Sequence, residues 1–378
     1  MTAYTYVDTP ALLEAAVRRL AASPILGVDT EAAGYHRYRD SLSLVQISSR
    51  EETVLIDPLA VPDLAPLAAL FSNGAIEKVF HDADFDLRIL DRDPGLSIDR
   101  LFDTQIAAMC LGMRALGLGA VLQACLGIEL EKAFQRADWA ERPLSEGMKA
   151  YAAADTAHLP ALRDALRERL VEAGRLAWAE EEFERRAQTR WTPPDTTDAF
   201  LRVKGAHALT RRALAVLREV HAWRESVAAE RDQPPARVVG NEVLLQIARD
   251  APTTTAALRG IRGLSPGLVD RRGAAMLAAI ARGLAVPDAD LPRYPRQERW
   301  ERDPVLEARG ERLREARNRV AAALDVDPGF LASRAALDDI ARLDPASLDD
   351  LAAIPGLRRW QSEALGEAIV GVLRAEQP

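Results

Sequence analysis

Two carboxylates stand one residue apart in the run Gly27–Glu31, and their types and spacing suit metal chemistry. Apolar residues lead into this run from Ile25, as expected of a β-strand. Because side chains alternate along a strand, Asp29 and Glu31 would point to the same face. Neighbouring carboxylates repel each other unless positive charge lies between them, and a divalent cation is the usual source. Alone the pair is weak evidence, since a solvated strand end shows the same spacing.

Three further residues could complete such a site. Asp86 follows a short strand-like run that ends at His81, where a helix is expected to begin. Tyr151 and Asp155 are four residues apart in an alanine-rich helical segment, so their side chains lie on one helix face. The alanines Ala152–Ala154 let another element approach that helix closely. Asp86, Tyr151 and Asp155 are therefore the further candidates for such a site.

The segments that would position these residues alternate between strand-like and helix-like patterns over residues 1–190. Apolar and β-branched runs predict strands at 4–7, 25–31, 43–48, 53–57 and 78–81. Helices are expected at 10–20, 64–71, 84–90, 104–112 and 121–126, followed by a long helical region over 147–190 with a break at Pro160. Within that region, Glu180–Glu182 is expected to be a solvated helix face. The fold class is an α/β domain with a mixed sheet, not a regular βαβ repeat.

The rest of the chain is almost entirely helical and contains an internal repeat. Ile247-Ala248-Arg249 returns as Ile340-Ala341-Arg342, and Gly263-Leu264 returns as Gly356-Leu357, at a constant offset of 93. Apolar positions kept in register without a gap indicate one helical fold used twice. Proline-rich linkers mark the boundaries. The predicted domains are residues 1–190, a linker at 191–203, a helical domain at 204–286, a linker at 287–303 and a second helical domain at 304–378.

Composition narrows the class of protein. The chain has 57 acidic and 49 basic residues, a net charge of -8, which argues against a protein that merely coats nucleic acid. A slight basic excess over 193–290 includes Lys204, Arg211, Arg212, Arg271 and Arg272, and suits a binding module. No membrane span or secretory signal is visible. The two cysteines, Cys110 and Cys125, have no metal-ligand spacing, and a reduced cytoplasm is expected.

With these motifs in order, the sequence resembles the ribonuclease D family of 3′→5′ exonucleases, in the tyrosine-bearing branch of the DEDD superfamily. Val28–Glu31 resembles its first motif, His81–Leu90 its second and Tyr151–Asp155 its third, while Asp138–Ser145 is similar to the approach to the third. The helical repeat resembles two HRDC domains, modules attached to ribonuclease D and RecQ-type helicases. The resemblance covers essentially the whole chain and implies an RNase H-like catalytic domain.

The resemblance also implies roles for individual residues. Asp29, Glu31, Asp86 and Asp155 would hold two divalent cations, Mg²⁺ or Mn²⁺, and Tyr151 would orient the attacking water. The expected products are nucleoside 5′-monophosphates from RNA with a free 3′ end, tRNA precursors above all. The chain departs from the family just after Glu31, where Ala32-Ala33-Gly34 replaces the usual bulky residue, although aromatic residues follow closely.

Several alternatives stay open. Thr30, His81 and Arg142 are candidate substrate contacts, but His81 could be a buried structural histidine and Arg142 could pair with Glu141 or Glu146. Trp139 and Trp178 are expected in the core. The substrate could be DNA, because no residue identifies a 2′-hydroxyl contact. In a different class of function, the tandem repeat could serve a non-catalytic nucleic-acid-binding scaffold. A monomer is expected.

Overall fold

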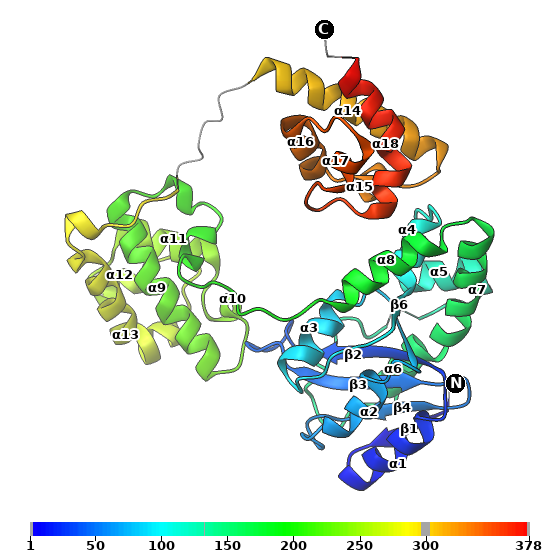
Figure 1. Cartoon of the computed structure of the whole chain (residues 1–378). Helices are drawn as coiled ribbons and strands as arrows, with labels where there is room; N and C mark the ends of the chain where they lie inside the picture. The colour runs from blue at the N-terminus through cyan, green and yellow to red at the C-terminus, as the bar shows by residue number, and fades with distance from the viewer. Residues whose placement is uncertain (1–2, 132, 296–302, 376–378) are drawn as a thin grey trace. The chain divides into compact units, whose positions relative to one another are not determined.

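The computed structural model describes residues 3–131, 133–295 and 303–375, and Figure 1 shows the chain. The chain divides into two compact units: residues 1–31, 42–191 and 300–378 form the first, and residues 32–41 and 192–299 form the second. Part of the predicted linker 287–303, from 296 to 302, lies outside the described residues.

A six-stranded mixed sheet forms the centre of the first unit (Figure 1). Its strands, in the spatial order β1-β4-β3-β2-β5-β6, are β1 (Tyr4–Val7), β2 (Ile25–Ala32), β3 (Leu42–Ser48), β4 (Thr53–Ile56), β5 (Glu77–Phe80) and β6 (Leu101–Asp103). β3 runs antiparallel to β4, whereas β1 is parallel to β4, and β5 is parallel to both β2 and β6. The mixed α/β class is confirmed. The strand β6 was not expected, since three residues are too few to show a periodicity.

Helices cover this sheet. They are α1 (Pro10–Leu20), a short turn η1 (Ala65–Leu67) that leads into α2 (Ala68–Phe71), α3 (Asp84–Arg92), α4 (Thr104–Cys110), α5 (Leu118–Leu126), α6 (Glu146–Ala157), α7 (Leu159–Glu172) and α8 (Leu176–Ala187). α6 contacts β3 and β4, α7 contacts β5, and α8 contacts β6. The expected long helical region is therefore three helices, with Pro160 in the first turn of α7.

One glycine lets the helices approach the central strand. A Cβ atom on Gly27 of β2 would lie 2.8 Å from both the Leu159 Cβ and the Thr156 carbonyl oxygen. Gly27 is two residues before Asp29 and so shares its face of the strand. The end of α6 can therefore pack directly beside the strand that carries Asp29 and Glu31.

The C-terminal helical domain of the first unit contacts the sheet domain through α8. It comprises α14 (Pro304–Ala323), α15 (Pro328–Leu331), α16 (Arg334–Leu343), α17 (Leu348–Ala352) and α18 (Arg359–Arg374). The Glu181 carboxylate accepts hydrogen bonds from the backbone N–H groups of Arg359 and Trp360, at 2.8 and 3.0 Å. The indole of Trp360 stacks on Trp178, with ring centroids 4.8 Å apart.

The prediction of a solvated helix face at Glu180–Glu182 is therefore wrong for Glu181 and Glu182. Glu182 is 3% exposed and accepts hydrogen bonds from Arg358 and from the Trp360 indole N–H, both at 3.1 Å. Buried carboxylates need such donors, which the composition of a three-glutamate run does not reveal.

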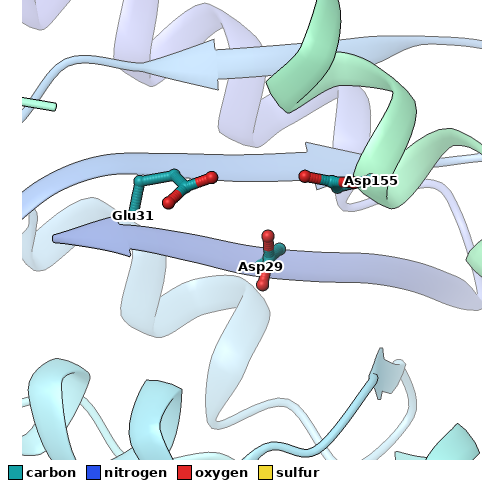
Figure 2. A group of neighbouring side chains, drawn as sticks. All are labelled: Asp29, Glu31 and Asp155. Carbon is teal, nitrogen blue, oxygen red and sulfur yellow. The ribbon is translucent and has the colours of Figure 1, made fainter. Parts of the chain in front are cut away.

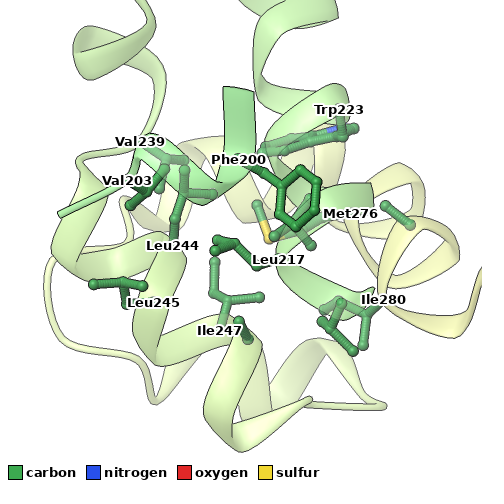
Figure 3. Packing of buried hydrophobic residues seen from close by; sticks show 14 of the residues in the cluster. Phe200, Val203, Leu217, Trp223, Val239, Leu244, Leu245, Ile247, Met276 and Ile280 are labelled. Carbon is green, nitrogen blue, oxygen red and sulfur yellow. The ribbon is translucent and has the colours of Figure 1, made fainter. Parts of the chain in front are cut away.

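The second unit has its own helical core, shown in Figure 3. Its elements are η2 (Ala199–Arg202), η3 (Ala206–Ala208), α9 (Arg211–Glu230), α10 (Pro235–Val238), α11 (Asn241–Asp250), α12 (Thr255–Arg259), α13 (Pro266–Ala285) and η4 (Asp288–Asp290). α11 and α16 begin at Asn241 and Arg334, 93 residues apart, and α12 and α17 keep the same offset. The predicted repeat is confirmed.

The segment just after β2 belongs to this second unit. Tyr38 packs against its core, and the Tyr38 backbone N–H donates to Asp232, 3.2 Å away. Residues 32–41 thus pack with the first helical domain, although the sequence assigned them to the catalytic domain. Arg211 and Arg212 bind backbone carbonyls at Leu291 and Leu284, and Arg272 pairs with Glu230. These three arginines hold the domain together.

Candidate active site

Three carboxylates meet where β2 and α6 adjoin. One ligand oxygen from each of Asp29, Glu31 and Asp155 lies within 4.8 Å of the others. In Figure 2, Asp29 and Glu31 project from one strand, and Asp155 faces Glu31 from the helix. The i, i+2 spacing on a strand and the close packing at Gly27 produce this arrangement.

The fourth predicted carboxylate, Asp86, lies next to this group on α3. It is 5% exposed, and the Thr30 hydroxyl donates a hydrogen bond to its Oδ1 at 2.5 Å. Thr30 lies between Asp29 and Glu31 in β2. Burial raises the pKa of Asp86, and the negative charge of Asp29 raises it further. The two carboxylates therefore interact electrostatically. Thr30, predicted as a substrate contact, thus holds Asp86.

The turn that carries Asp86 is fixed by Asp103 at the end of β6. The Asp103 carboxylate accepts hydrogen bonds from the backbone N–H groups of Asp82 and Ala83, at 3.0 and 2.9 Å. Asp82 needs this support because its φ of 61° is left-handed, a conformation unusual for a residue other than glycine. Asp103 also accepts from Gln105 at the start of α4. The unexpected strand β6 therefore places the second motif.

Burial without positive partners dominates the electrostatics of the cluster. Within the described part of the chain, none of the four carboxylates forms an ion pair with a lysine or arginine. Burial, followed by repulsion from the neighbouring acids, raises the pKa values of Asp29 and Glu31. Burial raises the pKa of Asp155 to about 7, against a smaller lowering by a hydrogen bond with Tyr151. Such a group of carboxylates is stable only when some of them are protonated or when a bound cation offsets their negative charge.

Tyr151 lies on the same helix face as Asp155 and shares a hydrogen bond with it. Burial, and then the charges of Asp155, Glu31 and Asp29, raise the pKa of the Tyr151 phenol above its ordinary value. The phenol therefore keeps its proton at neutral pH and acts as a hydrogen-bonding group rather than as a base.

A cavity of about 400 Å³ opens on this cluster. Besides Asp29, Tyr151 and Asp155, it is lined by Val28, His81, Asp82, Gln105, Gly117, Leu118, Gln135 and Leu159. Gln105 and Gln135 were not singled out from the sequence, because neither residue belongs to a motif that predicted the site.

The two remaining predicted contacts have different surroundings. His81 lines the cavity, with Nδ1 2.9 Å from the Thr104 hydroxyl. Its buried Nε2 makes no hydrogen bond of good geometry with the described residues, although burial, which lowers the pKa of His81, is partly opposed by an interaction with the Leu116 backbone. Arg142 lies elsewhere: its ion pair is with Asp57, at 2.7 Å, rather than with Glu141 or Glu146. Its other N–H groups donate to backbone carbonyls. The N–H donors of the Arg142 guanidinium are thus bound within the protein, so Arg142 has a structural role here.

The cluster fits a divalent cation. Only carboxylate oxygens, which are hard ligands, are brought together, and their mutual repulsion is uncompensated by the described side chains. Asp29, Glu31 and Asp155, with Asp86 beside them, are the residues that would hold it.

Comparisons with known proteins agree with this geometry. The 3'-5' exonuclease family model matches residues 4–171, and the HRDC domain model matches residues 213–280 and 307–373. Ribonuclease D of Acidiphilium cryptum is 36% identical over 367 residues, 95% of this chain and 90% of its own length. Ribonuclease D of Gluconacetobacter diazotrophicus is 36% identical over 376 residues, 97% of this chain and 94% of its own.

Solved structures are similar over the same extent. A protein from Bifidobacterium adolescentis has a TM-score of 0.86 at 26% identity, covering 98% of this chain and 97% of its own. Escherichia coli RNase D, described as an exoribonuclease involved in structured RNA processing, has a TM-score of 0.73 at 26% identity, and each chain is covered completely.

The fold and the acidic site define a 3′→5′ exonuclease of the divalent-metal-dependent DEDD class, extended by two HRDC domains. The chain belongs to the ribonuclease D family, and its activity is that of a 3′→5′ exoribonuclease.

Proposed function

We propose that this exoribonuclease shortens structured RNAs, tRNA precursors in particular, by removing nucleoside 5′-monophosphates from a free 3′ end with two divalent cations. The observation that carries the proposal is the group of buried carboxylates without positive partners beside a protonated phenol. The structured-RNA substrate is supported by the printed function of the E. coli relative.

The residues have separate tasks in this proposal. Asp29, Glu31, Asp86 and Asp155 would hold two Mg²⁺ or Mn²⁺ ions, which supply Lewis acidity and a water of lowered pKa when bound. The Tyr151 hydroxyl would orient the attacking water through a hydrogen bond. Thr30 keeps the Asp86 carboxylate in place. His81 lines the cavity and would contact the nucleotide.

The helical domains would contribute contacts with the RNA backbone. In the first helical domain, Lys204 and Arg271 are exposed and would contact RNA phosphates, whereas Arg211, Arg212 and Arg272 are used within the domain. No helix among the described residues could cross a membrane. A monomeric state and a cytoplasmic location stay predictions.

A time course on 5′-labelled single-stranded RNA, with a matched DNA strand, tests the proposal. We expect a ladder that shortens from the 3′ end with Mg²⁺ or Mn²⁺, stops with EDTA and runs faster on RNA. A faster reaction on the DNA strand would favour the DNA exonuclease instead. Intact RNA in every lane, with binding in a gel shift, would favour the non-catalytic scaffold.

A further inference from the structure

Two aromatic side chains from one segment enclose the phenol of Tyr151. Phe134 meets the Tyr151 ring edge-on, with centroids 6.0 Å apart and planes inclined by 64°. The Trp139 ring lies 6.2 Å from it at an inclination of 35°. Both separations fall in the range of favourable aromatic pairs. Both residues belong to the connection between α5 and α6.

A glycine in α6 makes room for one side of this enclosure. Gly147 precedes Tyr151 by four residues, so the two positions share a helix face. A Cβ atom on Gly147 would lie 2.9 Å from Cζ of Phe134, closer than real Cβ contacts. Any larger residue at this position must push the Phe134 ring away.

The other side of the enclosure is anchored in the sheet domain. Trp139 is 1% exposed and packs with Leu44 of β3 and Leu55 of β4. Its carbonyl oxygen accepts a hydrogen bond from Arg142 at 2.7 Å, and Arg142 is fixed in turn by Asp57. Trp139 thus forms a rigid wall, whereas Phe134 is only partly buried.

We propose that Phe134 and Trp139 are positioning residues that hold the Tyr151 ring so that its hydroxyl stays aligned with Asp155. The inference rests on the role proposed above for Tyr151. A hydroxyl that orients a water acts through the direction and length of its hydrogen bonds, which depend on where the ring lies. A displacement of about 1 Å at a catalytic group can cost on the order of 10²-fold in rate.

The connection between α5 and α6, which carries Phe134 and Trp139, also lines the cavity of the active site. Gln135, the residue after Phe134, lines the same cavity as Asp29, Tyr151 and Asp155. The Tyr151 ring therefore both lines the cavity and contacts the aromatic pair. Purely structural packing would not require a half-buried phenylalanine at the rim.

A double-mutant cycle separates positioning from general stability. In a single-turnover assay on a short 5′-labelled RNA, Tyr151→Phe should lower the rate by about 10²-fold and Phe134→Leu by about tenfold, with RNA binding unchanged. In the Tyr151→Phe background, Phe134→Leu should change the rate by less than about twofold. Phe134→Tyr should retain most of the wild-type rate, because it keeps an aromatic ring at this position. An equal loss in both backgrounds would overturn the proposal.

Two further variants keep the test decisive. Alanine has a higher helix propensity than glycine, so the Gly147→Ala variant should fold. As a single substitution Gly147→Ala should lower the rate, whereas in the Phe134→Leu background it should have no effect on the rate. Phe330→Leu, a matched loss of a partly buried ring beside Trp360, should leave the rate unchanged. If Tyr151→Phe is fully active, the positioning proposal fails while an Asp155-dependent nuclease stands. If Asp155→Asn is fully active, the proposed function itself fails.

Discussion

Two of the places where the sheet domain buries acidic residues have opposite electrostatics. Asp57, just after β4, is 3% exposed and accepts hydrogen bonds from Arg142 and from the Tyr6 hydroxyl. Burial alone would raise the pKa of Asp57, but these bonds lower it below its ordinary value. At Asp29, Glu31 and Asp155 burial raises the pKa values, and no cation among the described side chains offsets it.

The difference shows how a structural acid can be told from a functional one. The chain supplies the partners of Asp57, so that carboxylate contributes to folding by itself. The cluster at β2 and α6 costs stability in the absence of a ligand, a cost that natural proteins accept mainly at functional sites. Four experiments would test this contrast.

The largest difference is expected in activity. Asp155→Asn should lower the exonuclease rate by about 10³-fold, because a lost ligand removes several kcal/mol of charge stabilisation. Asp57→Asn, at the paired site, should lose far less of the rate per folded molecule, because the asparagine amide oxygen can still accept a hydrogen bond from Arg142, which binds the Trp139 carbonyl. The measurement is nucleotide release from 5′-labelled RNA, normalised to folded protein. Equal losses in the two variants would refute the distinction.

For stability the order is reversed: disrupting the paired site at Asp57 should have the larger effect on the free energy of unfolding. Arg142→Met leaves Asp57 buried without its cation and should lower the free energy of unfolding by about 3–5 kcal/mol. Urea denaturation followed by circular dichroism measures this value. Adding Asp57→Asn should recover part of the loss, because the uncompensated charge is then removed. A change below about 1 kcal/mol would show that the pair is not a structural device.

Divalent cations should stabilise only the unpaired site. At a concentration 100 times the dissociation constant, Mg²⁺ or Mn²⁺ should raise the free energy of unfolding of wild type by about 2.7 kcal/mol. Thermal unfolding with metal and with EDTA gives this difference. Asp155→Asn should show much less of it, while Asp57→Asn should respond as wild type does. A response of the same size in Asp155→Asn would place the cation elsewhere.

The smallest effect is a pH dependence in EDTA. The pKa of Asp155 is raised to about 7 in the folded state, so folded protein holds more protons than unfolded protein between about pH 4 and 7. Stability is therefore lost as the pH rises through this window. Wild type should lose roughly 2 kcal/mol more than Asp155→Asn, after allowance for water in the cavity. Parallel pH profiles for the two proteins would contradict the raised pKa.

Much of the site was predictable because its signals are local. The i, i+2 spacing of Asp29 and Glu31 and the i, i+4 spacing of Tyr151 and Asp155 each define one face of one element. The resemblance of these motifs to those of the ribonuclease D family then implied which faces meet. The repeat was equally visible, because its apolar positions keep a constant offset.

What the sequence did not predict depends on distant partners. Arg142 finds Asp57, 85 residues away, and Glu182 finds Arg358, 176 residues away. The support of the second motif by Asp103 needs a strand of only three residues. The enclosure of Tyr151 by Phe134 depends on a glycine whose missing side chain leaves no pattern in the sequence. Such pairings follow from tertiary structure rather than from periodicity.

The most direct test is a crystal structure with Mn²⁺ and a nucleoside 5′-monophosphate, examined by anomalous diffraction. We predict two anomalous peaks among Asp29, Glu31, Asp86 and Asp155, within reach of the phosphate and of the Tyr151 hydroxyl. Peaks elsewhere, with these four carboxylates still free of metal at saturating Mn²⁺, would contradict a catalytic centre built from buried acids that the protein leaves unpaired.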